Sequence, residues 1–199
     1  MCASKDNVLK IELPNADIEY IEDYYSVKEA DCFFQQMQQT LRWRQDDILM
    51  FGKRVKIPRL QAWYGDNNLL YRYSGTTLKA QPWTKTLQTL KTKVSDYCQL
   101  DFNAVLANLY RNQNDSVGWH SDNEVELGDS PTIASLSFGA AREFQLRHLE
   151  TKAKFSLVLA PGSLLIMRGS TQHFWQHCLP KRTRTIAPRI NLTFRKIWR

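Results

Sequence analysis

The stretch that decides the fold is Asn108-Leu-Tyr-Arg-Asn-Gln-Asn-Asp-Ser-Val-Gly-Trp-His-Ser-Asp122. Its last three residues place the imidazole of His120 two positions before the carboxylate of Asp122. In extended backbone, side chains at positions i and i+2 point to the same side. Alone, such a pair is a weak indication, because a solvated loop or a helix N-cap beside a surface histidine gives the same pattern. The rest of the chain decides between these interpretations.

The composition is that of a folded globular protein. The chain has 199 residues, of which 43% are hydrophobic and 12% aromatic. This is enough for one domain with a core, and it argues against disorder. The formal net charge of +7 makes an anionic partner such as nucleic acid a reasonable expectation, although many basic proteins bind nothing anionic.

The cysteines indicate a reducing compartment. Cys2, Cys32, Cys98 and Cys178 form neither a C-x-x-C pair nor the spacing of a zinc site. No apolar run approaches the roughly 18 residues of a membrane helix, and the N-terminal residues lack the apolar core of a secretory signal. We therefore expect reduced thiols, no membrane partner, and a location that is cytoplasmic in a bacterium or nuclear in a eukaryote.

Two helices are expected ahead of a strand-rich half. Residues 17–25 alternate apolar and acidic side chains, which predicts a strand leading to a turn. Ser26 and Glu29 form a capping box that opens a helix to about residue 42. Pro82 opens a second helix that runs to about residue 97.

From about residue 102, short apolar segments separated by turn residues predict β-strands. The expected strands are 103–111, 132–138, 142–148, 155–159, 163–168, 172–178 and 188–196. The order of elements predicts an α+β fold, a double-stranded β-helix or jelly roll with the N-terminal helices backing one sheet. We expect residues 1–199 to form a single monomeric domain, with a jelly-roll core over about 102–197 and a lid of hairpins over about 43–80.

The expected lid begins with a turn at Gly52 that follows Phe51. Four cations surround it: Lys53, Arg54, Lys56 and Arg59. An aromatic residue at a turn flanked by cations suits a loop that grips phosphate and inserts an apolar wedge. The alternative is a basic hairpin whose Phe51 tucks under.

Two aromatic segments follow. Residues 66–68 predict a hairpin turn between aromatic strands. Tyr71 and Tyr73 would share one face of the second strand, as a stacking platform for a base or as ordinary core residues.

The last strand has a polar face made of Arg189, Asn191, Thr193 and Arg195. This face either meets water or lines a polar cavity. Arginine suits a carboxylate, because its planar fork makes two parallel charge-assisted hydrogen bonds. Asn108 and Tyr110 also share a strand face, so amide and phenol donors could grip the other end of a small dicarboxylate.

A third metal ligand is available at His173 or His177. Two histidines and one carboxylate on one face form the ligand triad of non-haem Fe(II) oxygenases, which leaves positions open for a 2-oxo acid and O2. A metal beside a dicarboxylate site points to an Fe(II)/2-oxoglutarate oxygenase.

Six segments together resemble the AlkB family of nucleic-acid dealkylating dioxygenases, most closely its branch that repairs double-stranded DNA. They are Asn108–Tyr110, His120–Asp122, Ser137–Gly139, Pro161–Leu165, His177–Pro180 and Pro188–Arg195. The resemblance extends from about Ile48 to Ile197, and the Pro-Arg-x-Asn-Leu-Thr-Phe-Arg string is its most specific part.

The resemblance implies a set of site residues. His120, Asp122 and His177 would hold iron, and His173 would be structural, because only His177 precedes the Leu-Pro that follows the family's ligand. Arg195 would pair with the far carboxylate of 2-oxoglutarate, and Arg189 would lie nearer the metal. The implied set that binds 2-oxoglutarate is Asn108, Tyr110, Arg189, Thr193 and Arg195.

The resemblance also implies residues that bind the substrate. Phe51-Gly52-Lys53, with Arg59 nearby, is similar to a finger that probes the duplex. Tyr71, Arg72 and Tyr73 are similar to the strand that stacks on the damaged base, with Tyr73 where phenylalanine is usual. Asn123 stands where an acidic residue usually contacts the exocyclic amine of the base, which affects the base preference.

The implied activity is oxidative demethylation of 1-methyladenine and 3-methylcytosine in alkylated DNA. The cofactor would be Fe(II), with 2-oxoglutarate and O2 as cosubstrates and formaldehyde as a product. One alternative is an enzyme of the same class that acts on RNA or single strands. More distant alternatives are a module that binds alkylated DNA without catalysis and a hydroxylase of proteins or small molecules.

Overall fold

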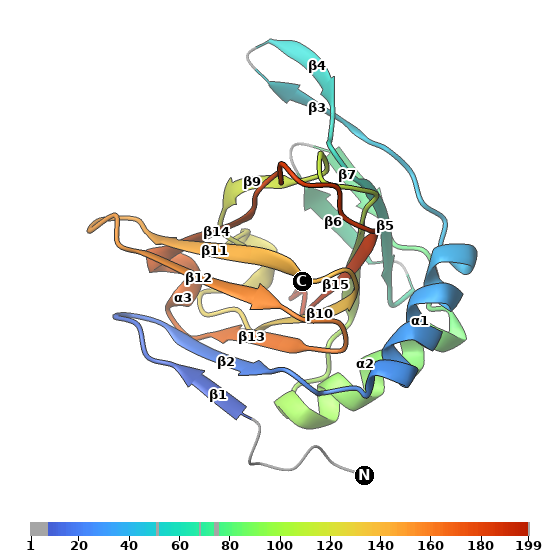
Figure 1. Ribbon diagram of the computed structural model, residues 1–199, viewed down its shortest axis with the longest axis horizontal. Coiled ribbons are helices and arrows are strands. Elements are labelled where there is room, and N and C mark those ends of the chain that lie inside the picture. Colours follow the sequence, from blue (N-terminus) through green and yellow to red (C-terminus); the bar gives the residue numbers. More distant parts are fainter. Residues whose placement is uncertain (1–7, 51, 68, 74–75, 199) are drawn as a thin grey trace.

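Two β-sheets form the body of the protein (Figure 1). The computed structural model describes residues 8–50, 52–67, 69–73 and 76–198, and of residues 49–50, 70–73 and 76–79 it describes only the backbone. The larger sheet has the strand order β1 (Val8–Ile11), β2 (Asp17–Ile21), β13 (Leu164–Arg168), β10 (Ile133–Gly139), β15 (Arg189–Arg195), β8 (Ala104–Tyr110) and β5 (Leu60–Gly65). The smaller sheet has the order β12 (Lys154–Leu159), β11 (Arg142–His148), β14 (Trp175–Leu179) and β9 (Val117–His120).

One hydrophobic core joins the two sheets. Leu106 of β8 and Leu165 of β13 pack in it with Phe144 of β11 and Trp175 of β14. All strand pairs within the sheets are antiparallel. The expected α+β fold built on a double-stranded β-helix is therefore confirmed.

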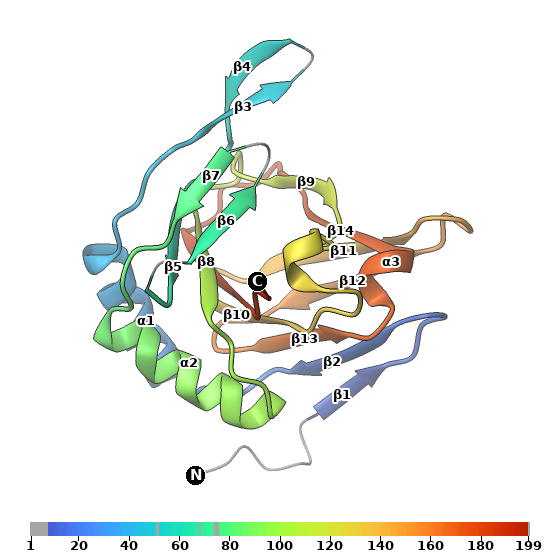
Figure 2. The same ribbon diagram turned by 180° about the vertical axis from the view of Figure 1, so that it is seen from behind.

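Helices α1 (Val27–Thr40) and α2 (Lys85–Cys98) cover the outer face of the larger sheet (Figure 2). Ser26 and Glu29 form the expected capping box at the start of α1. Helix α2 begins three residues later than expected from Pro82, because the side chain of Thr84 accepts a hydrogen bond from the amide of Leu87 and caps the helix there. None of the helices in the described part of the chain has the length and apolar character that crossing a membrane requires.

Strict alternation along β8 and β15 separates an apolar layer from a polar interior. Ile190, Leu192 and Phe194 of β15 pack in the core beneath the helices. The residues between them face the opposite side, yet they too are buried, with at most 8% of each residue exposed. The polar face of β15 therefore does not meet water. It lines the space between the sheets.

The prediction of a strand over residues 172–178 is wrong for the first half of that range. Residues Thr171–Phe174 form a helical turn, α3, and only Trp175–Leu179 are extended. The side chain of Thr171 accepts a hydrogen bond from the amide of Asp17 and donates one to the carbonyl of Arg168. Such bonds between side chain and backbone compete with strand pairing, which explains the turn.

The hairpin expected around residues 66–68 is also wrong. Strand β5 pairs with β8 in the larger sheet, whereas β6 (Leu70–Tyr73) pairs with β7 (Thr76–Lys79). The amide of Leu69 bonds to the carbonyl of Asp66, and this turn takes the chain out of the sheet instead of back along β5.

Two hairpins stand apart from the sheets. One consists of β3 (Asp47–Met50) and β4 (Lys53–Lys56), with Gly52 at a φ of +76° in the turn. The other is β6–β7, and Figures 1 and 2 show both on the side of the molecule where β9 lies. Phe51 lies outside the described residues, as do the side chains of Tyr71, Arg72 and Tyr73.

We expect Gly139→Ala to destabilise the fold. Gly139 ends β10 at a φ of +80°, and an added Cβ would lie 2.5 Å from the carbonyl oxygen of Pro188. Strain of this kind costs about 1–3 kcal/mol. Urea unfolding would measure the loss. Gly118→Ala is the matched control, because its Cβ would meet no atom within 4 Å, and equal stability of the two variants would contradict the packing at Gly139.

Candidate functional site

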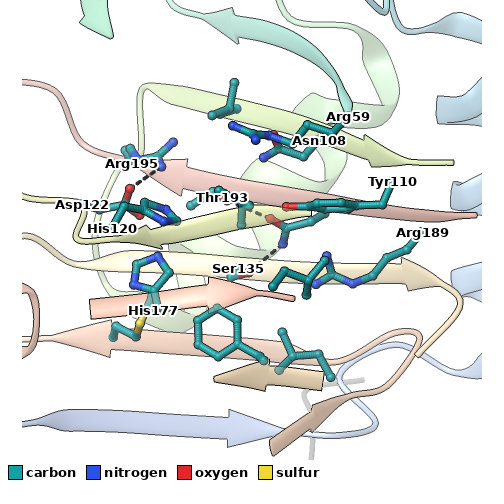
Figure 3. Close-up of a pocket in the computed structure, with 17 residues that line it drawn as sticks. Arg59, Asn108, Tyr110, His120, Asp122, Ser135, His177, Arg189, Thr193 and Arg195 are labelled. Atoms are coloured by element: carbon teal, nitrogen blue, oxygen red, sulfur yellow. Dashed lines mark hydrogen bonds and ion pairs between the residues drawn. The ribbon is translucent and has the colours of Figure 1, made fainter. Parts of the chain in front are cut away.

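Three potential metal ligands converge between the strands of the smaller sheet. His120 on β9 lies opposite His177 on the neighbouring strand β14, and Asp122 follows two residues after His120. One ligand atom from each residue lies within 4.8 Å of the other two. Figure 3 shows the three side chains gathered at one end of a cavity. The structure thus brings together the triad that was expected from the sequence.

Hydrogen bonds orient these ligands. Nδ1 of His120 lies 2.9 Å from the carbonyl oxygen of Gly118, which can only accept, so Nδ1 carries the proton and Nε2 is left with a free lone pair. The backbone amide of Asp122 donates to Oε1 of Gln172 at 2.9 Å. The hydroxyl of Ser121 donates to the carbonyl of Trp175 at 3.0 Å. The loop that carries Asp122 is therefore fixed to α3 and β14.

Charge is balanced by a buried ion pair. Nη2 of Arg195 lies 2.8 Å from a carboxylate oxygen of Asp122. Burial alone would raise the pKa of Asp122, but the Arg195 guanidinium and the two imidazoles outweigh it and hold this pKa well below its usual range. Burial, reinforced by His120, lowers the pKa of His177 to about 3, although Asp122 opposes the shift.

These protonation states suit a metal. At neutral pH Asp122 is ionised and His177 is neutral, and these are the forms that coordinate a cation. Two imidazoles and one carboxylate are the donor set of a non-haem Fe(II) centre. The residues present therefore fit the implied iron, with His120, Asp122 and His177 as the ligands.

The ligands open onto a polar cavity of about 50 Å³. Polar side chains that line it come from β8 and β15 and include Asn108, Tyr110, Asn191, Thr193 and Arg189, with Ser135 from β10. Apolar side chains close the other walls: Leu106, Val117, Phe144, Leu159, Met167 and Leu179. The residues expected to bind 2-oxoglutarate thus all line one cavity.

Arg189 lies at the end of β15 away from Arg195. Its guanidinium donates to the hydroxyl of Ser137 at 2.9 Å and lies 5.4 Å from the ring centroid of Tyr110. Its Nε is buried and has no hydrogen-bond partner among the described residues. Burial lowers the pKa of Arg189 to about 10, so the side chain stays charged at neutral pH. A buried cation with an unused donor suits an anionic ligand group.

The expected order of the two arginines is wrong. Arg195, expected at the far carboxylate, contacts the metal ligand Asp122, and Arg189, expected nearer the metal, does not. The two residues are six positions apart on one strand, which is about 20 Å of backbone. The alternation of polar and apolar residues predicted their shared face but carried no information on which end of the strand lies beside His120.

Arg59 does not belong with the surface cations. Lys53, Arg54 and Lys56 are exposed on β4, whereas Arg59 is only 6% exposed and lines the cavity. Its Nε donates to Oδ1 of Asn108 at 2.9 Å. The chain turns inward after the hairpin, so the expectation that Arg59 grips phosphate beside the other three does not match this structure.

Asn191 and Gln172 contribute to the site but were assigned no role from the sequence. Asn191 donates to Ser135 at 2.7 Å and accepts from Thr193 at 3.1 Å. The sequence predicted its place on the polar face of the last strand, and it lines the cavity. Gln172 gave no such signal, because its segment was expected to be a strand.

The residues after Asp122 differ in burial. Asn123, the expected contact to the base, is exposed. Oε2 of the following Glu124 is buried without a hydrogen-bond partner among the described residues. Glu124 follows the metal ligand Asp122 by two residues, and its carboxylate is an available charged acceptor, whereas the amide of Asn123 is a neutral one.

His173 lies outside the triad. It is exposed on α3, and its Nε2 contacts the carbonyl of Asp129. The cluster of possible ligands among the described residues contains His177 and not His173.

Comparisons with known proteins agree with this site. Residues 17–195 match the family model described as the 2OG-Fe(II) oxygenase superfamily. The chain is 43% identical over 185 residues to the human alpha-ketoglutarate-dependent dioxygenase alkB homolog 3, covering 88% of this chain and 64% of the human protein. It is 42% identical over 180 residues to the DNA oxidative demethylase ALKBH2 of Mus musculus, covering 85% of this chain and 75% of the mouse protein.

A solved structure supports the fold. The structure of OsALKBH1 matches with a TM-score of 0.67 at 14% identity, covering 95% of this chain and 99% of that one. The near-equal identities to alkB homolog 3 and ALKBH2 do not distinguish the duplex-repair branch that the sequence suggested.

We expect His177→Ala to weaken binding of Mn(II), used as a redox-stable probe, by about 100-fold or more, since loss of a supporting residue alone costs up to that much. His173→Ala removes an imidazole four residues away and should leave the affinity within about threefold. Isothermal titration calorimetry would measure both. Weaker binding in His173→Ala than in His177→Ala would exclude the triad assignment.

Proposed function

The chain belongs to the 2OG-Fe(II) oxygenase superfamily and, within it, to the AlkB family, and on this premise we propose that it removes methyl groups oxidatively from the nitrogen atoms of alkylated DNA bases. The cofactor is Fe(II), with 2-oxoglutarate and O2 as cosubstrates. The observation that carries the proposal is the cavity itself. It has a carboxylate and two imidazoles at one end and the partly unsatisfied guanidinium of Arg189 at the other.

Each end of the cavity has a separate task. His120, Asp122 and His177 hold Fe(II), which supplies the oxidising chemistry when bound. Arg195 keeps Asp122 ionised and fixes its carboxylate through the 2.8 Å contact. Arg189, with the phenol of Tyr110, binds the far carboxylate of 2-oxoglutarate. Asn108 and Thr193 lie between the two ends and orient the cosubstrate, and the apolar walls exclude water.

The nucleic-acid substrate is supported by the hairpin side of the molecule. Lys53, Arg54 and Lys56 are exposed on β4, and the chain carries a net charge of +7, so sequence-independent attraction to phosphate is expected. The methyl group of 1-methyladenine or 3-methylcytosine lies on the Watson–Crick edge, so the base must leave the stack to reach the iron site. Tyr71, Arg72, Tyr73 and Asn123 remain our proposed contacts to the flipped base.

The direct test is mass spectrometry of an oligonucleotide that carries one 1-methyladenine. We expect loss of one methyl mass that requires both Fe(II) and 2-oxoglutarate. His177→Ala should reduce the rate by at least about 100-fold, and His173→Ala should keep it. Succinate formation without loss of the methyl group would retain the oxygenase and reject this substrate. Absence of succinate from the iron-loaded protein would favour a module that only binds DNA.

Duplex DNA is our first candidate, and single-stranded DNA or RNA is the second. The first rests on the similarity of Phe51-Gly52-Lys53 to a duplex-probing finger, and Gly52 does lie in the turn of an isolated hairpin. The second is kept because the chain is almost equally identical to human alkB homolog 3, at 43%, and to mouse ALKBH2, at 42%.

Phe51→Ala separates these candidates. If Phe51 fills the gap left by the flipped base, its removal should lower activity on duplex DNA about tenfold or more, because that is the contribution of stacking one base on an aromatic ring. Activity on single strands should fall much less. Initial rates on a methylated duplex and on its single-stranded twin would be compared in the wild type and the variant. Equal losses on both would reject the wedge.

A further inference from the structure

Arg142, the first residue of β11, is a buried cation without a carboxylate partner among the described ion pairs. It is 1% exposed, and it does not line the cavity. Its nearby acidic neighbour, Asp115, turns its carboxylate to Arg111 instead. Burying a charge without an opposite charge is costly, so the position of Arg142 requires an explanation.

The hydrogen bonds of Arg142 all end on backbone carbonyls. Nη1 donates to Asn112 at 3.3 Å, and Nη2 donates to Asp115 at 3.0 Å and to Pro180 at 2.7 Å. Asn112 and Asp115 lie in the loop that leads to His120, and Pro180 follows His177 by three residues. One side chain therefore ties together the two segments that carry the histidine ligands.

Arg142 also lies against a cavity residue. Its guanidinium carbon is 5.8 Å from the ring centroid of Tyr110, and that of Arg189 is 5.4 Å from the same ring. Both distances are within the range of cation–π contacts. Tyr110 and Arg189 line the cavity, so Arg142 influences this end of it through the ring of Tyr110 and through its charge, apart from its bonds to the backbone.

Two buried cations thus lie against the ring of Tyr110, of which Arg189 lines the cavity and Arg142 does not. Burial lowers the pKa of each arginine, and Arg142 contributes to the lowering at Arg189, as expected for like charges in a medium of low dielectric constant. An anionic ligand group at this end relieves the repulsion. A ligand without that anionic group leaves the repulsion in place.

We propose that Arg142 is a positioning residue that selects a dicarboxylate cosubstrate. It holds the ring of Tyr110 near Arg189 and adds positive potential to the end of the cavity that receives the far carboxylate of 2-oxoglutarate. This rests on the proposed function. A purely structural role would weaken all 2-oxo acids alike, whereas selection through charge weakens only those with a second carboxylate.

Calorimetry without turnover tests this difference. Mn(II)-loaded protein is titrated with 2-oxoglutarate and with 2-oxopentanoate, which has a methyl group in place of the far carboxylate. Arg142→Met keeps the bulk and removes the charge, so the affinity for 2-oxoglutarate should fall about tenfold or more, and that for 2-oxopentanoate less than about threefold. Arg142→Lys, which keeps the charge, should restore most of the preference.

Arg168→Met is the matched control. Arg168 on β13 forms an ion pair with Glu19 at 3.1 Å, is also partly buried, and does not line the cavity. Its loss should leave the preference unchanged. Should Arg142→Met not fold, Arg142→Gln replaces it, because its amide can still donate to one carbonyl, and the same loss of preference is expected.

The outcomes separate the two proposals. Wild-type protein that does not prefer 2-oxoglutarate would overturn the proposed function, and this inference with it. If the wild type prefers 2-oxoglutarate, two results for the Arg142→Met variant would overturn this inference alone. One is that the variant keeps the preference, and the other is that its affinity falls equally for both acids.

Discussion

The ion pair between Arg195 and Asp122 is the contact on which the arrangement of the site depends. Arg195 belongs to β15 in the larger sheet, and Asp122 follows β9 of the smaller sheet, so the pair links the two sheets across their shared interior. Both residues are at most 3% exposed. A buried pair of this kind gives little net stability, but removing either charge leaves the other without compensation. The pair therefore fixes where the metal ligands lie relative to the polar strand β15.

The interior between the sheets is divided into a dry part and a polar part. Leu106, Leu165 and Trp175 fill the dry part as an ordinary sandwich core. The polar part is made from the remaining inward positions of β8, β10 and β15, where the amide of Asn191 donates a hydrogen bond to the hydroxyl of Ser135. The helices cover the outer face of the same sheet, so apolar residues are needed on one side of β15 and polar residues on the other. The fold can hold a polar ligand inside because apolar side chains pack both beneath the helices and in the rest of the space between the sheets.

The sequence carried enough periodicity to predict most of the strands, the first helix with its cap and the common face of the polar residues. His120, Asp122 and His177 were recognisable from residue type and resemblance. The errors share one cause, which is that periodicity reports faces and not positions in space. It could not place Arg195 rather than Arg189 beside Asp122, bury Arg59, or reveal that Thr171 bonds to the backbone and begins a helical turn.

His120 on β9 pairs with His177 on β14, so the geometry of the metal site depends on the length of the loop that precedes β9. A shift of β9 by one residue would turn the imidazole of His120 away from the interior and bring Trp119 into its place. The loop at residues 111–116 sets that register, and the bonds of Arg142 to Asn112 and Asp115 hold the loop at this length. Surface loops elsewhere commonly accept insertions and deletions, but here a single inserted residue would dismantle the metal site while every ligand remained in the sequence.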